Sequence, residues 1–106
     1  MFARSVSIRL KPKGLAEFAR VIETEAIPWL REQEGFQDEI TFFVPGGSEV
    51  IEISLWNRKE DADAYGRKAS PGVLKALENV IEGDSQVRTY AVSNSTFHKI
   101  ATPVFG

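Results

Sequence analysis

Residues 36–56 read FQDEITFFVPGGSEVIEISLW, and this stretch decides the fold. Apolar and polar residues alternate on both sides of Pro45–Ser48, and that period of two is typical of β-strands. The two glycines of Pro45–Ser48 can adopt the positive φ that tight turns need. The pattern therefore predicts an antiparallel hairpin of two strands, Phe36–Val44 and Glu49–Trp56.

A strand and a helix are predicted before this hairpin. Residues from Ala3 to Leu10 alternate as a strand, and from Leu15 to Trp29 apolar residues recur every three or four positions, which indicates one helical face. Pro28 removes a backbone donor and its ring presses on the carbonyl four residues earlier, so we expect a kink near Thr24. Gly35 ends the helix.

A second helix in two pieces is predicted after the hairpin. Asn57 followed by Glu60 resembles a capping box, which indicates a helix start. Gly66 weakens this helix, and Ser70-Pro71 provides a second start with proline at the first helical position.

The complete order of elements predicts the fold class. A β-rich run from Val87 to about Phe97 forms a last, long strand, and a tail follows from His98. The order βαββαβ predicts an α+β, ferredoxin-like sandwich with a four-stranded antiparallel sheet and both helices on one face. We expect one domain over residues 1–106, with its core at about residues 3–97.

The composition of the chain excludes several classes of binding site and partner. The chain has 106 residues, no cysteine, one histidine and a net charge of -2. These features argue against disulfides, thiolate metal sites and a nucleic-acid partner. No phosphate-cradling glycine loop, signal sequence or long apolar run is present, so we expect no cofactor, no metal, no membrane contact and a cytoplasmic location.

The face of the sheet away from the helices predicts a homodimer. If the apolar residues of Glu49–Trp56 face the helices, an aromatic and small-polar set faces away, and such a face favours cover by a second sheet. We therefore expect two sheets packed face to face as a dimeric α+β barrel. The residues predicted to face the helices are Ile51, Ile53 and Leu55, and those predicted to face away are Ser5, Ser7, Thr41, Phe43, Glu52, Ser54 and Trp56.

Two segments, Pro28–Phe36 and Ser54–Ala62 leading to Tyr65 and Ser70-Pro71, resemble the antibiotic biosynthesis monooxygenase-like superfamily of dimeric α+β barrels. The resemblance spans roughly residues 6–97. It implies a pocket between sheet and helices in each subunit. Tyr65 replaces a histidine common in family oxygenases, and Ser7 replaces an asparagine of the haem-degrading branch, which argues against haem degradation.

The resemblance implies a cofactor-independent monooxygenase that acts on a flat aromatic, quinol or polyketide-like small molecule. The alternative is a non-catalytic, small-molecule-binding or structural homodimer with the same fold. Whether the chain is an enzyme stays open at this point.

Three residues are the catalytic candidates. Tyr65 could donate its phenolic hydrogen to a bound carbonyl or fill the core with its hydroxyl bonded to the backbone. Asn57 could orient a ligand oxygen or cap a helix. His98, the only histidine, could deprotonate a phenol as a general base, or lie at the surface after the last strand.

Four residues are the ligand-binding candidates, and three of them have a structural alternative. Trp56 could stack on a flat ligand or pack in the dimer interface. The other three are Ser7, Phe42 and Trp29, of which Phe42 and Trp29 could instead fill the core. Arg4, Arg9 and Arg88 could bind an anionic group or pair across strands with Glu39 or Glu52.

Overall fold

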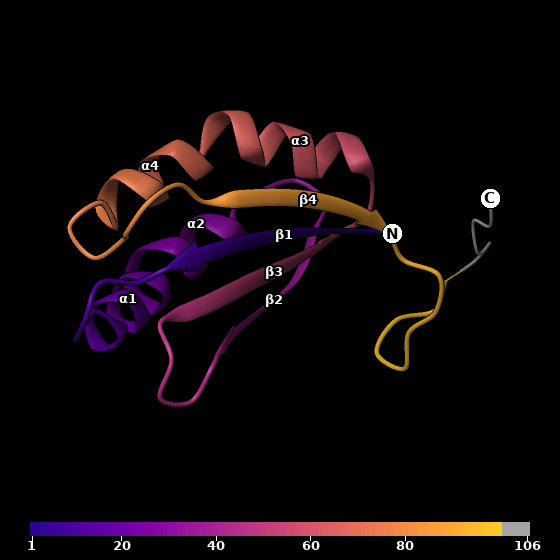
Figure 1. Cartoon of the computed structure of the whole chain (residues 1–106). Coiled ribbons are helices and arrows are strands. Elements are labelled where there is room, and N and C mark those ends of the chain that lie inside the picture. The colour runs from indigo at the N-terminus through magenta and orange to yellow at the C-terminus, as the bar shows by residue number, and fades with distance from the viewer. Residues whose placement is uncertain (101–106) are drawn as a thin grey trace.

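The computed structural model describes residues 1–100, and its elements follow the predicted order (Figure 1). Two helical segments separate and cover the strands: α1, a π-helical segment η1 and α2 form the first, and α3 and α4 form the second. The strands are β1 (Phe2–Arg9), β2 (Phe36–Phe43), β3 (Glu49–Trp56) and β4 (Gln86–Ala91), and the helical elements are α1 (Leu15–Val21), η1 (Ile22–Ala26), α2 (Ile27–Arg31), α3 (Lys59–Lys68) and α4 (Ser70–Ala76).

The four strands form one antiparallel sheet in the order β2-β3-β1-β4. Both helical segments pack on the same face, because buried residues of α1, η1 and α4 join one hydrophobic cluster with Val6, Ile8 and Val50 of the sheet. Figure 1 shows α3 and α4 running along this sheet. The predicted ferredoxin-like fold class, with a broken second helix, is confirmed.

The first helical segment is interrupted where proline requires it. The backbone widens into the π-helical segment Ile22–Ala26, and Pro28 follows as the second residue of α2. Pro28 cannot donate the hydrogen bond that an α-helix would direct to Thr24, so the regular ladder breaks there. The Thr24 hydroxyl donates a hydrogen bond to the Arg20 carbonyl oxygen at 2.7 Å. The expected kink is therefore a π-helical turn.

The last strand is shorter than predicted. β4 ends at Ala91, which pairs with Phe2, and the Val92 N–H then donates to the Met1 carbonyl at 2.9 Å. The pairing of β4 with β1 ends there, and the chain leaves the sheet. The prediction of a strand to about Phe97 was wrong, because its length depends on the partner strand.

The predicted helix cap at Asn57 was also wrong. Helix α3 starts at Lys59 with Arg58 as its N-cap, and no side chain caps it. The Asn57 side-chain oxygen accepts a hydrogen bond from Gln37 Nε2 at 2.7 Å instead. Asn57 lies one residue too early to cap the helix, and it ties the end of β3 to the start of β2.

The orientation of β3 is the main correction. Val50, Glu52, Ser54 and Trp56 are buried under the helices, whereas the alternate residues Ile51, Ile53 and Leu55 point to the other face. The reason is the pairing register: Glu52 lies opposite Val6 of β1, and directly opposite residues share one face of an antiparallel sheet.

The same register places the remaining strand residues. Thr41 lies opposite Glu52, so Thr41 and Phe43 face the helices rather than away from them. Ser5 and Ser7 lie opposite Ile53 and Ile51 and face away, as expected. We call the surface away from the helices the open face, and its apolar residues are Ile40, Phe42, Ile51, Ile53 and Leu55.

Candidate active site

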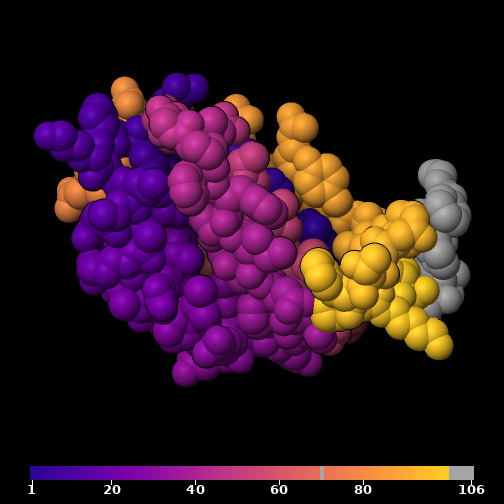
Figure 2. Space-filling model, turned by 90° about the horizontal axis from the view of Figure 1, so that it is seen from below, coloured from indigo at the N-terminus to yellow at the C-terminus, as the bar shows by residue number. Residues whose placement is uncertain are grey.

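A cavity of about 770 Å³ lies between strand β2 and the α1–η1 segment. In Figure 2 this segment (indigo to purple) lies beside the β2–β3 hairpin (magenta). The cavity wall is mainly apolar, and its largest side chains are Leu15, Phe18, Ile22, Ile27 and Phe43. Lys13, Glu23, Glu39 and Thr41 supply its polar side chains.

Strand β2 contributes the polar part of the sheet wall. Glu39 is partly buried, and its carboxylate accepts a hydrogen bond of 2.5 Å from the Thr41 hydroxyl. Burial raises the pKa of Glu39, and the hydrogen bond from Thr41 opposes this effect. Glu39 is therefore a carboxyl group that takes up a proton more readily than an exposed one.

Glu52 of β3 lies next to Glu39 on the same face. It stands opposite Thr41, is 6% exposed, and its Oε1 atom has no hydrogen-bond partner among residues 1–100. Burial, and then the negative charge of Glu39, raise the pKa of Glu52 to about 7, while Arg4 lowers it. A carboxyl group that titrates near neutrality can exchange protons at cellular pH.

Aromatic and cationic side chains lie close to the Glu39–Glu52 pair. The Arg4 guanidinium lies 5.4 Å from the centroid of the Tyr65 ring, and the Trp56 and Tyr65 rings are 5.2 Å apart. Trp56 Nε1 donates to the Ser54 hydroxyl at 2.8 Å. Burial raises the pKa of Tyr65 above its usual value, so this phenol stays protonated near neutral pH.

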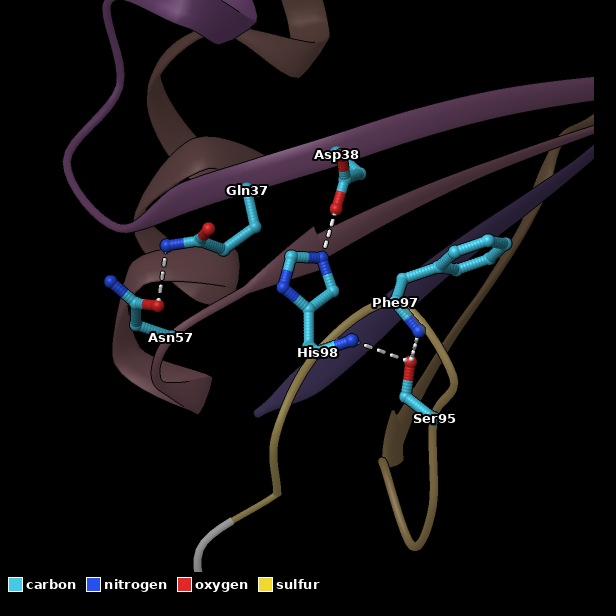
Figure 3. A network of polar contacts seen from close by, with 6 residues as sticks. All are labelled: Gln37, Asp38, Asn57, Ser95, Phe97 and His98. Carbon is cyan, nitrogen blue, oxygen red and sulfur yellow. Dashed lines mark hydrogen bonds and ion pairs between the residues drawn. The ribbon is translucent and has the colours of Figure 1, made fainter.

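The structure separates the three catalytic candidates predicted from sequence. Tyr65 is buried beside Trp56, whereas Asn57 is exposed and bonded to Gln37. His98 comes from the segment after β4 and pairs with Asp38 of β2 (Figure 3). Asp38 lies opposite Leu55, so this pair belongs to the open face. None of the three catalytic candidates lines the cavity in the part of the chain that is described.

The four predicted ligand-binding residues are separated as well. Trp56 is fully buried, so it lies away from the open face and its predicted role in a sheet-to-sheet interface was wrong. Ser7 and Phe42 lie on the open face, on either side of Ile51. Trp29 is 42% exposed and packs on Gly72 of α4, where a Cβ atom would lie 2.8 Å from its ring.

Sequence reasoning treated Glu39 and Glu52 only as cross-strand partners for arginines. The signal that could have identified them is the pairing register. Once Val6 is assigned to the core, Glu52 must share its face, and Thr41 and Glu39 follow on β2. Two acidic residues at inward positions of neighbouring strands are uncommon in a structural core and indicate a site.

Comparisons with known proteins fit this architecture. No family model matches the chain, and no curated protein matches it. Among solved structures, SnoaB, a cofactor-independent oxygenase from Streptomyces nogalater, superposes with a TM-score of 0.74 at 12% identity, covering 90% of this chain and 95% of SnoaB. The chain has the fold of the antibiotic biosynthesis monooxygenases.

Two further structures share this monooxygenase fold. The ActVA-Orf6 monooxygenase of Streptomyces coelicolor, solved with Nanaomycin D, has a TM-score of 0.74 at 14% identity, covering 92% of each chain. A protein of unknown function from Nitrosomonas europaea has a TM-score of 0.74 at 13% identity, covering 90% of this chain and 91% of its own. Identities this low establish the fold, not the reaction.

Residues 1–100 contain neither a membrane-spanning helix nor a cluster of metal-ligand side chains. Their helices are all too short or too polar to cross a membrane. Their histidine, aspartate and glutamate side chains form no group of three that could hold a metal ion.

Proposed function

We propose that this chain is a cofactor-independent monooxygenase that acts on a flat aromatic, quinol or polyketide-like molecule in the helix–sheet cavity. One observation carries the proposal: a largely apolar cavity of about 770 Å³ has a partly buried carboxyl group, Glu39, in its sheet wall. Cavities of this size accommodate ligands of several fused rings, and a few polar groups fix their orientation.

The chemistry follows from this arrangement. Removal of a proton from an electron-rich ligand yields an anion that can itself reduce oxygen. For an anthrone, the ring CH₂ group and O₂ give a carbonyl group and water, so the ligand supplies all the electrons. Of the two carboxylates that line the cavity, Glu39 is the partly buried one and can accept the proton, and Thr41 orients it.

In this proposal Tyr65 is a positioning residue that acts on the carboxyl group of Glu52. Its ring contacts the Arg4 guanidinium, and Arg4 in turn opposes the raised pKa of Glu52. Trp56 packs against the other side of this arrangement and holds Ser54 by a hydrogen bond. Tyr65 therefore acts on Glu52 through Arg4 rather than on the ligand, and Trp56 packs on Tyr65.

We further propose that the open face forms a homodimer with a second copy of the chain. Ile40 and Phe42 are 42% and 51% exposed, and they lie beside Ile51 and Ile53 of β3. An exposed apolar patch of this kind on one face of a sheet favours a two-fold contact. If the chain is not an enzyme, a ligand-binding homodimer is the alternative function.

Oxygen uptake with an anthrone or a hydroquinone tests the enzymatic proposal. The protein should raise uptake above the spontaneous rate, and ¹⁸O₂ should label the carbonyl product of the anthrone. Glu39→Gln should lower the rate by roughly tenfold or more, as expected for loss of a general base. Glu82→Gln is the control, since Glu82 is exposed and outside the cavity.

Other outcomes separate the alternatives. Thermal stabilisation by these molecules without oxygen uptake would indicate a binding protein. Neither stabilisation nor uptake across a broad panel of aromatic compounds would refute the cavity as a ligand site.

A further inference from the structure

Glu39 and Glu52 are diagonal neighbours on the helix-covered face of the sheet. Glu39 lies opposite Ser54 and Glu52 lies opposite Thr41, so the two carboxyl groups come from adjacent strands two positions apart. Diagonal neighbours have Cβ atoms about 7 Å apart, a separation that long side chains can bridge. Only Glu39 of the two lines the cavity in the part of the chain that is described, so Glu52 stands behind it.

Negative groups outnumber positive groups around Glu39 and Glu52. Arg4 of β1 faces Glu52 with one positive charge, and Tyr65 of α3 contributes a neutral phenol. Lys13 and Glu23 lie on the helical side of the cavity, where both are exposed to solvent. Two carboxylates and one guanidinium thus share a poorly solvated interior, which disfavours full ionisation of the pair.

The charge of Glu39 acts on Glu52. Burial raises the pKa of both Glu39 and Glu52. The negative charge of Glu39 contributes to raising the pKa of Glu52 to about 7. Interacting carboxyl groups titrate as a unit, and their protons leave in two steps. Below about pH 7 the inner group, Glu52, holds a proton while Glu39 can be ionised.

We propose that Glu39 and Glu52 form one coupled acid–base unit that accepts the proton of a ligand hydroxyl and rejects ligand carboxylates. The proposal rests on the proposed function, since it requires the cavity to be the ligand site. In the step, the ligand O–H bond breaks, its electron pair stays on the ligand oxygen, and a new O–H bond forms on Glu39. Glu39 is the catalytic residue, and Glu52 is a positioning residue that sets the charge of the pair.

The negative charge of the Glu39–Glu52 pair predicts the class of ligand. A hydroxyl group can donate a hydrogen bond to Glu39, whereas a carboxylate would meet the like charge of this partly buried group. The site should therefore select neutral, hydroxylated aromatic molecules. When Glu52 also ionises, the repulsion of anions should increase, but the binding of neutral ligands should not weaken.

Three naphthalene probes test this selectivity. 2-Naphthol carries a hydroxyl donor, 2-methoxynaphthalene lacks the donor, and 2-naphthoate is an anion, while their ring systems are the same. None of the three changes its charge between about pH 6 and about pH 8, whereas Glu52 does. Dissociation constants for each probe at both pH values can be measured by calorimetry.

We expect 2-naphthol to bind most tightly of the three. The preference for 2-naphthol over 2-naphthoate should grow severalfold from about pH 6 to about pH 8, because ionised Glu52 adds a second negative charge to the pair. We call this growth of the preference the pH step. Glu52→Gln should remove the pH step, because the pair then carries only the negative charge of Glu39 at both pH values. Glu39→Gln should reduce the preference itself by tenfold or more.

Two control variants exclude other origins of the pH step. His98→Gln should keep it, because His98 pairs with Asp38 on the open face. Glu82→Gln should keep it because Glu82 is exposed and far from the cavity wall. Circular dichroism verifies that each variant is folded, and carbon-13 NMR of the glutamate carboxyl groups should show the titration of Glu52 shifting to lower pH in Glu39→Gln, because the charge of Glu39 is then absent.

The outcomes distinguish the two proposals. Equal affinity for 2-naphthol and 2-methoxynaphthalene, or a pH step that persists in folded Glu52→Gln, would overturn the coupled unit while the cavity remains a ligand site. An unchanged Glu52 titration in Glu39→Gln would overturn it as well. If none of the three probes binds, the proposed function fails first, and the coupled unit fails with it.

Discussion

Val6 of β1 and Glu52 of β3 lie directly opposite each other, and both are buried beneath the helices, at 3% and 6% exposure. A carboxyl group therefore occupies a position whose partner belongs to the hydrophobic core. This placement has a direct consequence for stability, because the folded chain must accommodate Glu52 in either protonation state.

The stability of the protein should fall as pH rises through the titration of Glu52. Its pKa is about 7 in the folded chain against an ordinary value of 4.5, so between these values the folded state binds more protons. Above pH 7 the buried carboxylate should cost about 3 kcal/mol. Glu52→Gln should thus stabilise the protein in urea unfolding at about pH 8 and change little at about pH 5.

The matched control for this prediction is Glu82→Gln, which neutralises an exposed carboxylate. It should leave the pH dependence of the unfolding free energy unchanged. The same slope in wild type and Glu52→Gln would show that Glu52 keeps its ordinary pKa in the folded chain.

Replacement of Gly35 by alanine should strongly destabilise the fold. Gly35 has φ 79°, and a Cβ atom there would lie 2.0 Å from Asp61 Oδ2. The backbone conformation and the collision together should cost about 2 kcal/mol or more in the free energy of unfolding. Gly46→Ala separates the two effects, since Gly46 has φ 73° but no atom within 4 Å of its Cβ position.

Gly46→Ala should accordingly cost only about 1 kcal/mol, the conformational part alone. Urea unfolding of both variants provides the comparison. Equal losses would mean that Asp61 moves aside without cost.

Removal of the His98 side chain should loosen the segment after β4. His98 pairs with Asp38 of β2, and the Ser95 hydroxyl accepts hydrogen bonds from the backbone of Phe97 and His98 (Figure 3). His98→Ala should speed amide hydrogen exchange at Phe97 and His98 severalfold while β1 and β3 stay protected. Asp38→Asn should act in the same direction, and unaltered exchange in both variants would show that the pair does not hold the segment.

The proposed homodimer should depend on Ile53 at the centre of the open face. Ile53 pairs with Ser5 on one side and Ile40 on the other, so a charge there would be buried in a sheet-to-sheet contact. Ile53→Glu should give monomers in sedimentation velocity, where the wild type gives dimers. Val87→Glu is the control, because Val87 is also exposed but lies opposite Val6 on the helix-covered face.

A folded Ile53→Glu variant that remains a dimer would place the interface elsewhere. Trp56 is unsuitable for this test, although the sequence pattern assigned it to the interface. Its ring is fully buried against Tyr65 and Phe36, so a charged replacement would disrupt the core.

Local patterns in the sequence were enough to predict the elements and their order. The hairpin of β2 and β3, the break before Pro28 and the second helix start at Ser70-Pro71 all follow from residues a few positions apart. Local rules of this kind also gave the fold class, since the order βαββαβ leaves few ways to build one sheet.

The tertiary structure alone decided which residues meet. The side on which Glu52 and Trp56 lie depends on their opposition to Val6 and Phe2, and the end of β4 depends on where β1 begins. Strand periodicity separates two faces but does not say which one the helices cover. The cavity and the Glu39–Glu52 pair exist only because long-range pairing turns both acidic side chains inward, where burial changes their affinity for protons.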